Sequence, residues 1–253
     1  MKLSYKILFL VLGLVITING SAQEAEKFQK GVTAYTAGNY NEALQSWIDI
    51  YNTGYRSANL DYNIGNAYFK LGDIPNAILF YERAYLLKPA DNNINYNLEI
   101  ARSLTVDRFN EIPELFFLKW FDFLALLFHG NTWSIISITT FILCLLFLSV
   151  YIYSAKYRSK VIGFWLGLVL FIISGASIFL AWQNRTLVYD SHKGIISVAQ
   201  VSGKSSPDNS GTDLFVIHEG TKVTLGEELS GWYEITLSDG NKGWIPSNSL
   251  NII

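Results

Sequence analysis

Cysteine is almost absent from this chain, since the only one among its 253 residues is Cys144, inside a long apolar run. A single thiol cannot form an intramolecular disulfide, so each folded part of the chain must be stable through packing alone. The apolar surroundings favour a role for Cys144 as a small apolar filler of a helix contact.

Groups that carry out chemistry are also scarce. The three histidines, His129, His192 and His218, stand at no spacing that is typical of a metal site. Asp190, Ser191 and His192 are the residue types of a catalytic triad, but neighbours in sequence do not have triad geometry. The chain has no HExxH motif and no glycine-rich phosphate loop. We therefore expect no enzyme activity, and no catalytic residue, metal or cofactor.

Charged residues make up only 16% of the chain, and the basic ones form no exposed cluster apart from a short connector at 156–160. Nucleic-acid binding therefore finds no support. Half of the residues are hydrophobic, and they are concentrated in uninterrupted blocks instead of recurring with a helical or strand period. This distribution predicts a multi-domain membrane protein that carries small soluble modules.

The first apolar block, Ile7 to Ile18, has the anatomy of a secretory signal. It follows two lysines and precedes the small residues Gly20 and Ala22. We predict a signal peptide over residues 1–22, and because no cysteine follows, a lipidated N-terminus is excluded. If the signal is not cleaved, it becomes an N-terminal anchor, and the next domain still lies outside the cytoplasm.

Two further blocks, Trp133 to Ala155 and Val161 to Trp182, contain no charge and are long enough to cross a hydrocarbon core of roughly 30 Å as helices. The connector Lys156 to Lys160 holds three cations in five residues. By the positive-inside rule the connector is cytoplasmic. We predict a two-helix transmembrane hairpin, 133–155 and 161–182, in the lipid of a bacterial inner membrane, with both flanking domains periplasmic.

A further apolar stretch, 112–129, precedes this hairpin. Glu114, Lys119 and Asp122 interrupt it, and burying those charges in lipid would cost several kcal/mol. We predict an interfacial amphipathic helix on the outer leaflet that starts near Pro113. The alternative is a helix packed against a membrane segment of a partner.

A period of 34 residues relates two segments near the start of the chain. The pairs that share this offset are Gly31 with Gly65, Ala43 with Ala77, and Trp47 with Tyr81. Small residues let two antiparallel helices approach closely, and the aromatic side chains fill the volume beside them. The pattern resembles the tetratricopeptide (TPR) family, which implies an all-α solenoid. We predict a TPR domain over 23–108, with repeats at 24–57 and 58–91 and a capping helix from about residue 92.

In the TPR register, the first helices of the repeats line a concave face that binds peptides. The residues that the resemblance places on this face are Phe28, Val32, Tyr35, Tyr62, Asn63, Asn66, Phe69, Tyr96 and Asn97. Asparagine amides can hold the backbone of an extended peptide while the aromatic rings pack between its side chains. Asn93 and Asn97 stand where some family members carry cations that clamp a carboxylate, which argues against that mode here. The alternative is that these residues contact the rest of this chain or the membrane helices.

From about Arg185 onward the chain shows short alternating apolar runs separated by turn residues, as in a small barrel. The predicted strands are Gly194–Val201, Leu214–His218, Thr221–Gly226, Trp232–Leu237 and Lys242–Pro246. Gly203 to Gly211 is a polar loop between the first two strands, and Ser238 to Gly240 is a hairpin turn of the Asp-Gly type.

This segment, 186–253, resembles the bacterial SH3 family. The matching residues include the runs from Gly231 to Ile235 and from Asp239 to Pro246. The resemblance implies an all-β SH3-like barrel with a ligand groove beside the polar loop. Tyr233 and Trp244 are the candidate ligand contacts. The alternative is that these aromatic side chains belong to the barrel core.

The order of signal peptide, TPR pair, apolar linker, hairpin and SH3 module resembles BatE-type proteins of the aerotolerance operon, found in Bacteroidetes-like bacteria and spirochaetes. The resemblance implies an inner-membrane complex, encoded alongside a MoxR-type ATPase and von Willebrand factor A domain proteins, with a role in envelope or oxidative stress. We therefore expect a non-enzymatic scaffold whose periplasmic modules bind partner proteins. The alternative is a cell-wall sensor or anchor whose SH3-like domain binds peptidoglycan peptides.

Overall fold

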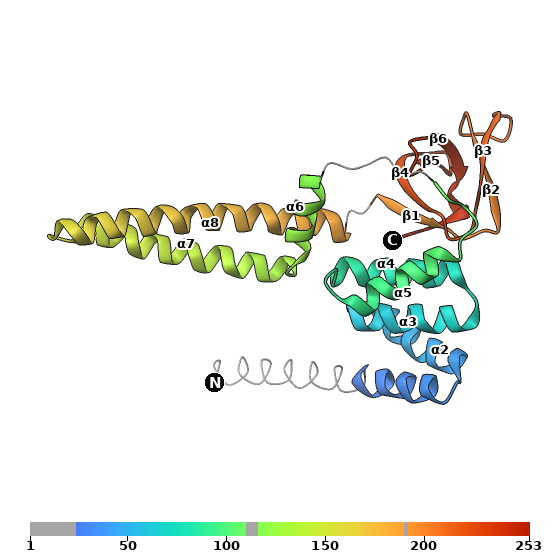
Figure 1. Cartoon of the computed structure of the whole chain (residues 1–253), viewed down its shortest axis with the longest axis horizontal. Coiled ribbons are helices and arrows are strands. Elements are labelled where there is room, and N and C mark those ends of the chain that lie inside the picture. The colour runs from blue at the N-terminus through green and yellow to red at the C-terminus, as the bar shows by residue number, and fades with distance from the viewer. Residues whose placement is uncertain (1–23, 110–115, 190–191) are drawn as a thin grey trace, which may run out of the picture.

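The structure, a computed structural model, describes residues 24–109, 116–189 and 192–253. A long helical hairpin extends from a head in which helices lie beside a β-sheet domain (Figure 1). The signal peptide predicted at 1–22 and the helix start predicted at Pro113 lie outside the described residues.

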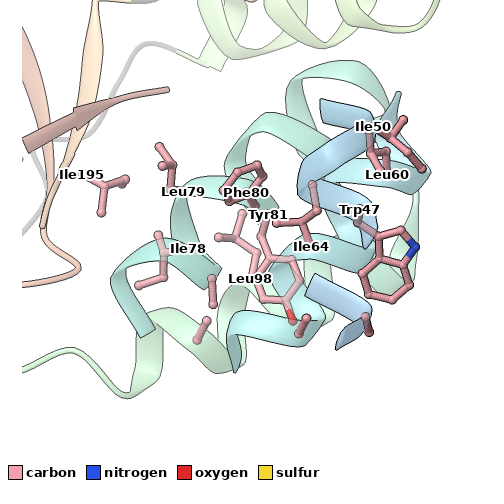
Figure 2. Packing of buried hydrophobic residues seen from close by; sticks show 14 of the residues in the cluster. Trp47, Ile50, Leu60, Ile64, Ile78, Leu79, Phe80, Tyr81, Leu98 and Ile195 are labelled. Carbon is pink, nitrogen blue, oxygen red and sulfur yellow. The ribbon is translucent and has the colours of Figure 1, made fainter. Parts of the chain in front are cut away.

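The helical region, residues 24–104, forms one part of the head. Its elements are a helix at residues 24–36, α2 (Tyr40–Tyr51), α3 (Ala58–Leu71), α4 (Ile74–Leu87) and α5 (Asn92–Ser103). Trp47, Leu60, Ile64, Ile78 and Tyr81 are each at most 1% exposed and belong to one core cluster (Figure 2). Burying such a side chain contributes about 1.5–3 kcal/mol, so this core accounts for the packing of α2, α3 and α4 against one another.

The 34-residue period has a direct structural cause. A Cβ atom added at Gly31 would lie 2.3 Å from Trp47 Nε1, and one added at Gly65 would lie 2.7 Å from the Tyr81 ring. Each glycine therefore allows an aromatic side chain of the following helix to lie against its backbone. Trp47 Nε1 also donates a hydrogen bond to the Phe28 carbonyl oxygen at 3.2 Å. These contacts explain the repeat, while the assignment to the TPR family stays a prediction.

The turns within the two helical pairs are also equivalent. Gly38 and Gly72 have φ values of +82° and +81°, which favour glycine because it lacks a Cβ atom. Asp73 then caps α4 by accepting a hydrogen bond from the Asn76 backbone N–H at 3.2 Å. The sequence positions that set the period are thus the turn and contact positions of the fold.

The hairpin consists of α7 (Gly130–Tyr153) and α8 (Tyr157–Tyr189). By length and composition, both helices are able to cross a membrane. They approach closely, since a Cβ atom added at Gly163 would lie 2.9 Å from the Phe147 carbonyl oxygen. The hydroxyls of Ser137 and Ser174, both buried between the helices, lie 3.1 Å apart. The described helices extend beyond the predicted spans 133–155 and 161–182 at the end that faces the head.

A short helix, α6 (Phe116–Leu126), lies against the head end of the hairpin (Figure 1). Gln183 Nε2 of α8 donates a hydrogen bond to Asp122 Oδ1 at 2.9 Å, and Trp133 Nε1 donates to the Ala125 carbonyl oxygen at 3.0 Å. Trp120 is 56% exposed on this helix. One interrupting charge of the predicted interfacial helix is therefore partnered by the hairpin itself.

The β-domain, residues 192–253, is a seven-stranded antiparallel sheet in the order β3-β2-β6-β5-β4-β1-β7. Its elements are β1 (Lys193–Ile196), β2 (Gln200–Lys204), β3 (Asp213–His218), β4 (Lys222–Leu229), β5 (Trp232–Thr236), β6 (Lys242–Pro246), the 3-10 turn η1 (Ser247–Ser249) and β7 (Leu250–Ile252). Buried aliphatic side chains such as Ile196, Ile217 and Ile235 fill its core, and Phe109 packs against them from the segment that leaves the helical region.

The single strand predicted over Gly194–Val201 is wrong. β1 pairs with β4 and β7, whereas β2 pairs with β3 and β6, so the chain must change direction between Ile196 and Gln200. One straight strand cannot pair with β4 and β7 and also with β3 and β6, because these two groups of strands are at opposite ends of the strand order. β7 is absent from the sequence prediction, since three residues are too few for an alternation pattern.

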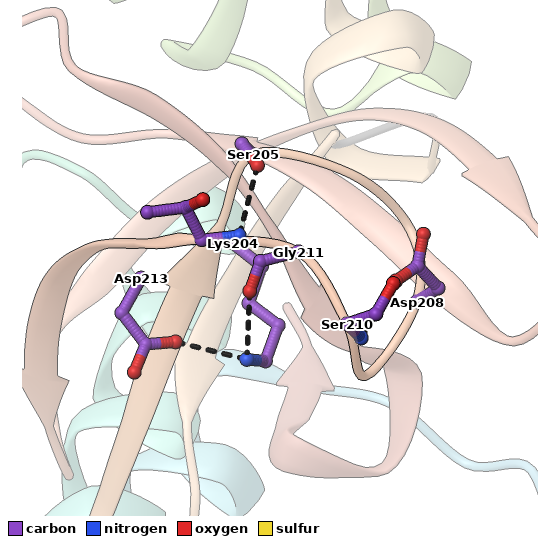
Figure 3. A network of polar contacts seen from close by, with 7 residues as sticks. Lys204, Ser205, Asp208, Ser210, Gly211 and Asp213 are labelled. Carbon is purple, nitrogen blue, oxygen red and sulfur yellow. Dashed lines mark hydrogen bonds and ion pairs between the residues drawn. The ribbon is translucent and has the colours of Figure 1, made fainter.

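The polar segment between β2 and β3 forms a tied hairpin loop (Figure 3). Lys204 Nζ donates a hydrogen bond to the Gly211 carbonyl oxygen at 3.2 Å and forms an ion pair with Asp213 Oδ1 at 2.9 Å. Ser205 Oγ accepts a hydrogen bond from the Thr212 backbone N–H at 3.1 Å. Because β2 continues to Lys204, the loop starts slightly later than the sequence pattern predicts.

Candidate functional site

A pocket of about 280 Å³ opens on the face shared by the first helix, α3 and α5. Five of the nine predicted groove residues line it: Tyr35, Tyr62, Asn66, Phe69 and Asn97. Three lining residues were missed by sequence reasoning, namely Lys70, Tyr81 and Ile100. We call this pocket the groove. Its four aromatic lining residues, Tyr35, Tyr62, Phe69 and Tyr81, therefore come from three different helices.

The other four predicted residues do not line the groove. The rings of Phe28 and Trp47 lie 6.3 Å apart, and Val32 packs against the helical core. Asn63 is half-buried outside the lining set, and Tyr96 is 65% exposed. The helical rotation therefore turns these side chains toward the core or away from the pocket.

Hydrogen bonds fix the polar floor of the groove. Asn66 Oδ1 accepts from the Tyr81 hydroxyl at 2.8 Å and from Asn97 Nδ2 at 2.9 Å. Asn97 Nδ2 also donates to the Tyr62 hydroxyl at 2.9 Å. Both amide protons of Asn97 are thereby used, since a carboxamide has two. Among the residues that the structure describes, neither Asn66 Nδ2 nor the Tyr62 hydroxyl proton makes a hydrogen bond, so both are available as donors to a ligand.

The groove is neutral except at its rim. Burial raises the pKa of Tyr81, with neighbouring tyrosines adding to the effect, and burial likewise raises the pKa of Tyr35. Both hydroxyls therefore keep their protons at physiological pH. Lys70, exposed at the edge of the pocket, supplies a single positive charge. The site can accept a polar, extended ligand, and its free hydrogen-bonding groups are mostly donors.

A second contact region joins the helical region to the β-domain. Ile195 of β1 points toward Ile78 and Leu79 of α4 and belongs to the helical core cluster (Figure 2). Gly220, with φ +81°, lies so close to the helices that an added Cβ atom would be 2.8 Å from Thr105 Cγ2, just after α5, and 3.2 Å from Ile78 Cδ1 of α4. The two domains therefore share apolar packing.

Polar contacts surround this packing. Glu82 of α4, 2% exposed, accepts a hydrogen bond from Lys222 Nζ of β4 at 2.7 Å and another from Arg102 of α5. Arg83 Nη2 donates to the Ile252 carbonyl oxygen at 2.5 Å. Burial raises the pKa of Glu82, but the two cations outweigh burial and hold the pKa below its ordinary value. Glu82 is therefore an ionised carboxylate between the domains.

Asp107 makes a third set of bonds between the domains. Its Oδ2 accepts from the His218 backbone N–H and from Thr221 Oγ1, both at 2.7 Å, and its Oδ1 lies 2.9 Å from His218 Nδ1. Burial raises the pKa of Asp107, but these hydrogen bonds outweigh burial and lower it. We call the contacts of Glu82 and Asp107 with the β-domain the clasp.

The two predicted ligand contacts of the β-domain do not form one platform. Tyr233 is opposite Ile245 and Trp244 is opposite Glu234 in the β5–β6 register, so the two rings lie on opposite faces of the sheet. Tyr233 packs against the core and donates a hydrogen bond to Glu228 at 2.8 Å. Trp244 is half-buried on the outer face, which it shares with Trp232. Ligand binding by either ring stays a prediction.

In the described ranges 24–109, 116–189 and 192–253, no group of three or more His, Cys, Asp or Glu side chains is arranged to hold a metal ion. Asp190 and Ser191, which the sequence places beside His192, lie outside these ranges.

Comparison with known families gives a match to the bacterial SH3 domain over residues 204–251. The match runs from the end of β2 to β7 and covers most of the β-domain. The SH3 resemblance seen in the sequence is confirmed over that segment. Comparison with curated proteins gives no match.

Proposed function

We propose that the chain is a non-enzymatic, membrane-anchored scaffold that binds an extended segment of a partner protein in the groove. The observation that carries this proposal is the groove itself, where a hydrogen-bonded network of Tyr62, Asn66 and Asn97 leaves donors unused among the described residues, between aromatic walls. Such amide donors can bind the backbone carbonyl oxygens of an extended peptide.

The available groups favour a partner segment with acceptors. Asn66 Nδ2 and the Tyr62 hydroxyl proton are donors, and Asn97 Oδ1 is the complementary acceptor. Lys70 adds a cation at the rim. We propose that the segment is extended and carries an acidic side chain near Lys70.

The contact between helical region and β-domain supports the predicted topology. The two domains precede and follow the hairpin, so they can touch only if both lie on the same side of the membrane. Two spans return the chain to the side from which it started, and the cations at 156–160 favour a cytoplasmic turn. We therefore propose that the head is periplasmic and that α7 and α8 anchor it in a bacterial inner membrane.

The domain order also supports a TPR-containing, BatE-type protein. On that basis we propose that the partners are membrane proteins with von Willebrand factor A domains, in a complex for aerotolerance or envelope stress. A second function, binding of peptidoglycan peptides, is favoured by the shared outer face of Trp232 and Trp244 on β5 and β6.

Photo-crosslinking in native membranes tests the scaffold function. A photoreactive residue in place of Ile100, which lines the groove, should give a protein adduct, whereas one in place of Tyr96 on the same helix should not. Lys70→Glu should reduce the adduct at least several-fold, because it reverses the rim charge without touching the core. The same charge change at exposed Lys242 of β6 is the matched control.

Two results would count against the proposal. If Lys70→Glu gives as much adduct as the wild type, the bound segment does not carry an acidic side chain near Lys70. If photoreactive residues at Ile100 and Tyr96 give equal adducts, the groove is not the binding site. Sedimentation of the chain with purified peptidoglycan, lost in Trp232→Ala with Trp244→Ala and unaffected by Lys70→Glu, would favour the cell-wall function instead.

A further inference from the structure

A second cavity lies where the hairpin meets the helical region. It has a volume of about 510 Å³ and is bounded by the end of α4, the start of α7 and the end of α8. Ligand pockets in proteins commonly measure about 300–1,000 Å³, so the cavity can hold a small molecule or part of a larger one. It is separate from the groove and from the clasp, with no lining residue in common.

The walls of this cavity differ in polarity. One wall is apolar and is formed by Leu86 and Leu87 of α4, while Val188 of α8 lies one turn from the polar residues. The other is polar and includes Asn184 and Arg185 of α8. An occupant that satisfies both walls must be amphipathic, because unpaired polar groups and exposed apolar surface each cost free energy.

The polar wall is held in place by the fold. Asn184 is 5% exposed, and its Nδ2 donates to the carbonyl oxygens of Ala125 at 3.1 Å and Phe128 at 3.2 Å. A Cβ atom added at Gly130 would lie 3.1 Å from Asn184 Oδ1, so glycine lets α7 begin against this side chain. The cavity is therefore bounded by fixed atoms from three elements.

Arg185 follows Asn184 and is exposed at the cavity. Its guanidinium group has no hydrogen-bond or ion-pair partner among the residues that the structure describes. Guanidinium groups bind phosphate oxygens through paired N–H donors. The cavity thus offers a cation to an anionic group beside an apolar wall.

The position of the cavity along the hairpin indicates that an anionic ligand would come from the membrane. The aromatic side chains Trp120, 56% exposed, and Trp182, 60% exposed, lie at this end of the hairpin. Tryptophan is enriched where a membrane protein meets the headgroup layer. Below them, α7 and α8 expose apolar side chains that acyl chains can cover.

We propose that this cavity binds the headgroup of an anionic phospholipid, with its phosphate at Arg185 and its acyl chains along α7 and α8. This inference rests on the membrane anchoring in the proposed function. A bound lipid would fill the space between the hairpin and α4 and so fix the angle of the head to the membrane.

Native mass spectrometry of the full chain tests the site. The chain is reconstituted in nanodiscs of phosphatidylcholine with 20% phosphatidylglycerol, about the anionic share needed for competition, then washed in detergent. We expect about one phosphatidylglycerol per chain in the wild type and at least a fivefold loss in Arg185→Gln. Arg158→Gln, at the far end of α8, is the matched control and should retain the lipid. Leu86→Trp, which fills the apolar wall, should lose it.

Equal retention by the wild type, Arg185→Gln and Leu86→Trp would overturn the proposal. Displacement of the bound species by inorganic phosphate would overturn it as well, because it would assign the cavity to free phosphate. Release of the chain from membranes by alkaline carbonate would instead contradict the membrane anchoring on which the inference rests, so the two failures can be told apart.

Discussion

Glu82 allows a sharp test of the clasp. Its side chain is 2% exposed, and its two cations come from different domains, Arg102 from α5 and Lys222 from β4. We predict that removing both cations with Arg102→Met and Lys222→Met destabilises the head more than removing the carboxylate with Glu82→Gln.

The difference follows from the burial of the three groups. Without its cations, Glu82 is a buried charge with no ion partner, and such a loss costs about 3–5 kcal/mol. In Glu82→Gln the cations keep contact with water, because the side chains of Lys222 and Arg102 are 32% and 46% exposed. We expect that variant to lose about 1.5–3 kcal/mol, typical of hydrogen bonds to a charged group. Adding Glu82→Met to the double variant removes the isolated charge and should restore most of the lost stability.

The pH dependence gives an independent check. The lowered pKa of Glu82 means that its ion pairs stabilise the head above the ordinary value of 4.5, and this contribution is lost as pH falls through the folded-state pKa. In the double variant only burial acts, so the folded-state pKa is raised and protonation relieves the instability as pH falls. The stability gap between the wild type and the double variant should therefore narrow from pH 7 to pH 4.

Urea titrations of the full chain in nanodiscs, followed by tryptophan fluorescence and by protease resistance of the head, give the free energies of unfolding. Lys242→Met, which removes an exposed cation of β6, is the control and should change the free energy by less than about 0.5 kcal/mol. If the double variant is no less stable than Glu82→Gln, or if Glu82→Met fails to rescue it, the account of the clasp is wrong.

Two further predictions concern topology and pH. In a Cys144→Ser background, a cysteine at Ser205 should react with a membrane-impermeant reagent from the periplasmic side and one at Ser159 should not, and the reverse pattern would contradict the topology. Burial raises the pKa of Asp61 to about 7, and its Oδ1 has no hydrogen-bond partner among the described residues. The free energy of unfolding should therefore decrease as the pH rises from about 4 to about 7, by at most about 1.4 kcal/mol per pH unit. Asp61→Asn should flatten this dependence, as measured by thermal melts at several pH values.

The helical pairs were predictable because their determinants are local or repeat at one fixed offset. Gly31 and Gly65 each face an aromatic side chain that lies 16 positions later, so one contact produces the same spacing twice. The strands of the β-domain with clear alternation, such as β5 and β6, were likewise found. β1 and β7 were not, because their limits depend on which distant strands they pair with.

The groove was only partly predictable, because helix rotation decides which side chains reach it. Lys70 lies four residues after Asn66 and Ile100 three residues after Asn97, so helical spacing places both on the groove face. Tyr81 was assigned as a filler beside Gly65, and it is one, but its hydroxyl also reaches the groove floor. Because one Tyr81 side chain both packs beside Gly65 and reaches the groove floor, the second contact leaves no signal of its own in the sequence.

The clasp left one trace in the sequence. Glu82 is an acidic residue at the end of the buried run from Ala77 to Glu82, where an ionised side chain is stable only with partners. That observation predicts a buried cation, but it does not identify Lys222, which is 140 residues away. Contacts between domains depend on the shapes and charges of the two folded surfaces, and no sequence period or motif indicates which residues will meet.

The position of the hairpin in the chain gives the clasp a consequence for binding. The described chain leaves the head after Phe109, which packs against the β-domain core, and re-enters the β-domain at His192. The helical region and the β-domain are thus each connected to the hairpin, and the clasp joins them into one body. A head attached at two points cannot swing as freely as one attached at a single point. The groove is then presented at a restricted height and angle above the proposed membrane, which favours a partner that is itself anchored there and lowers the entropy lost on binding.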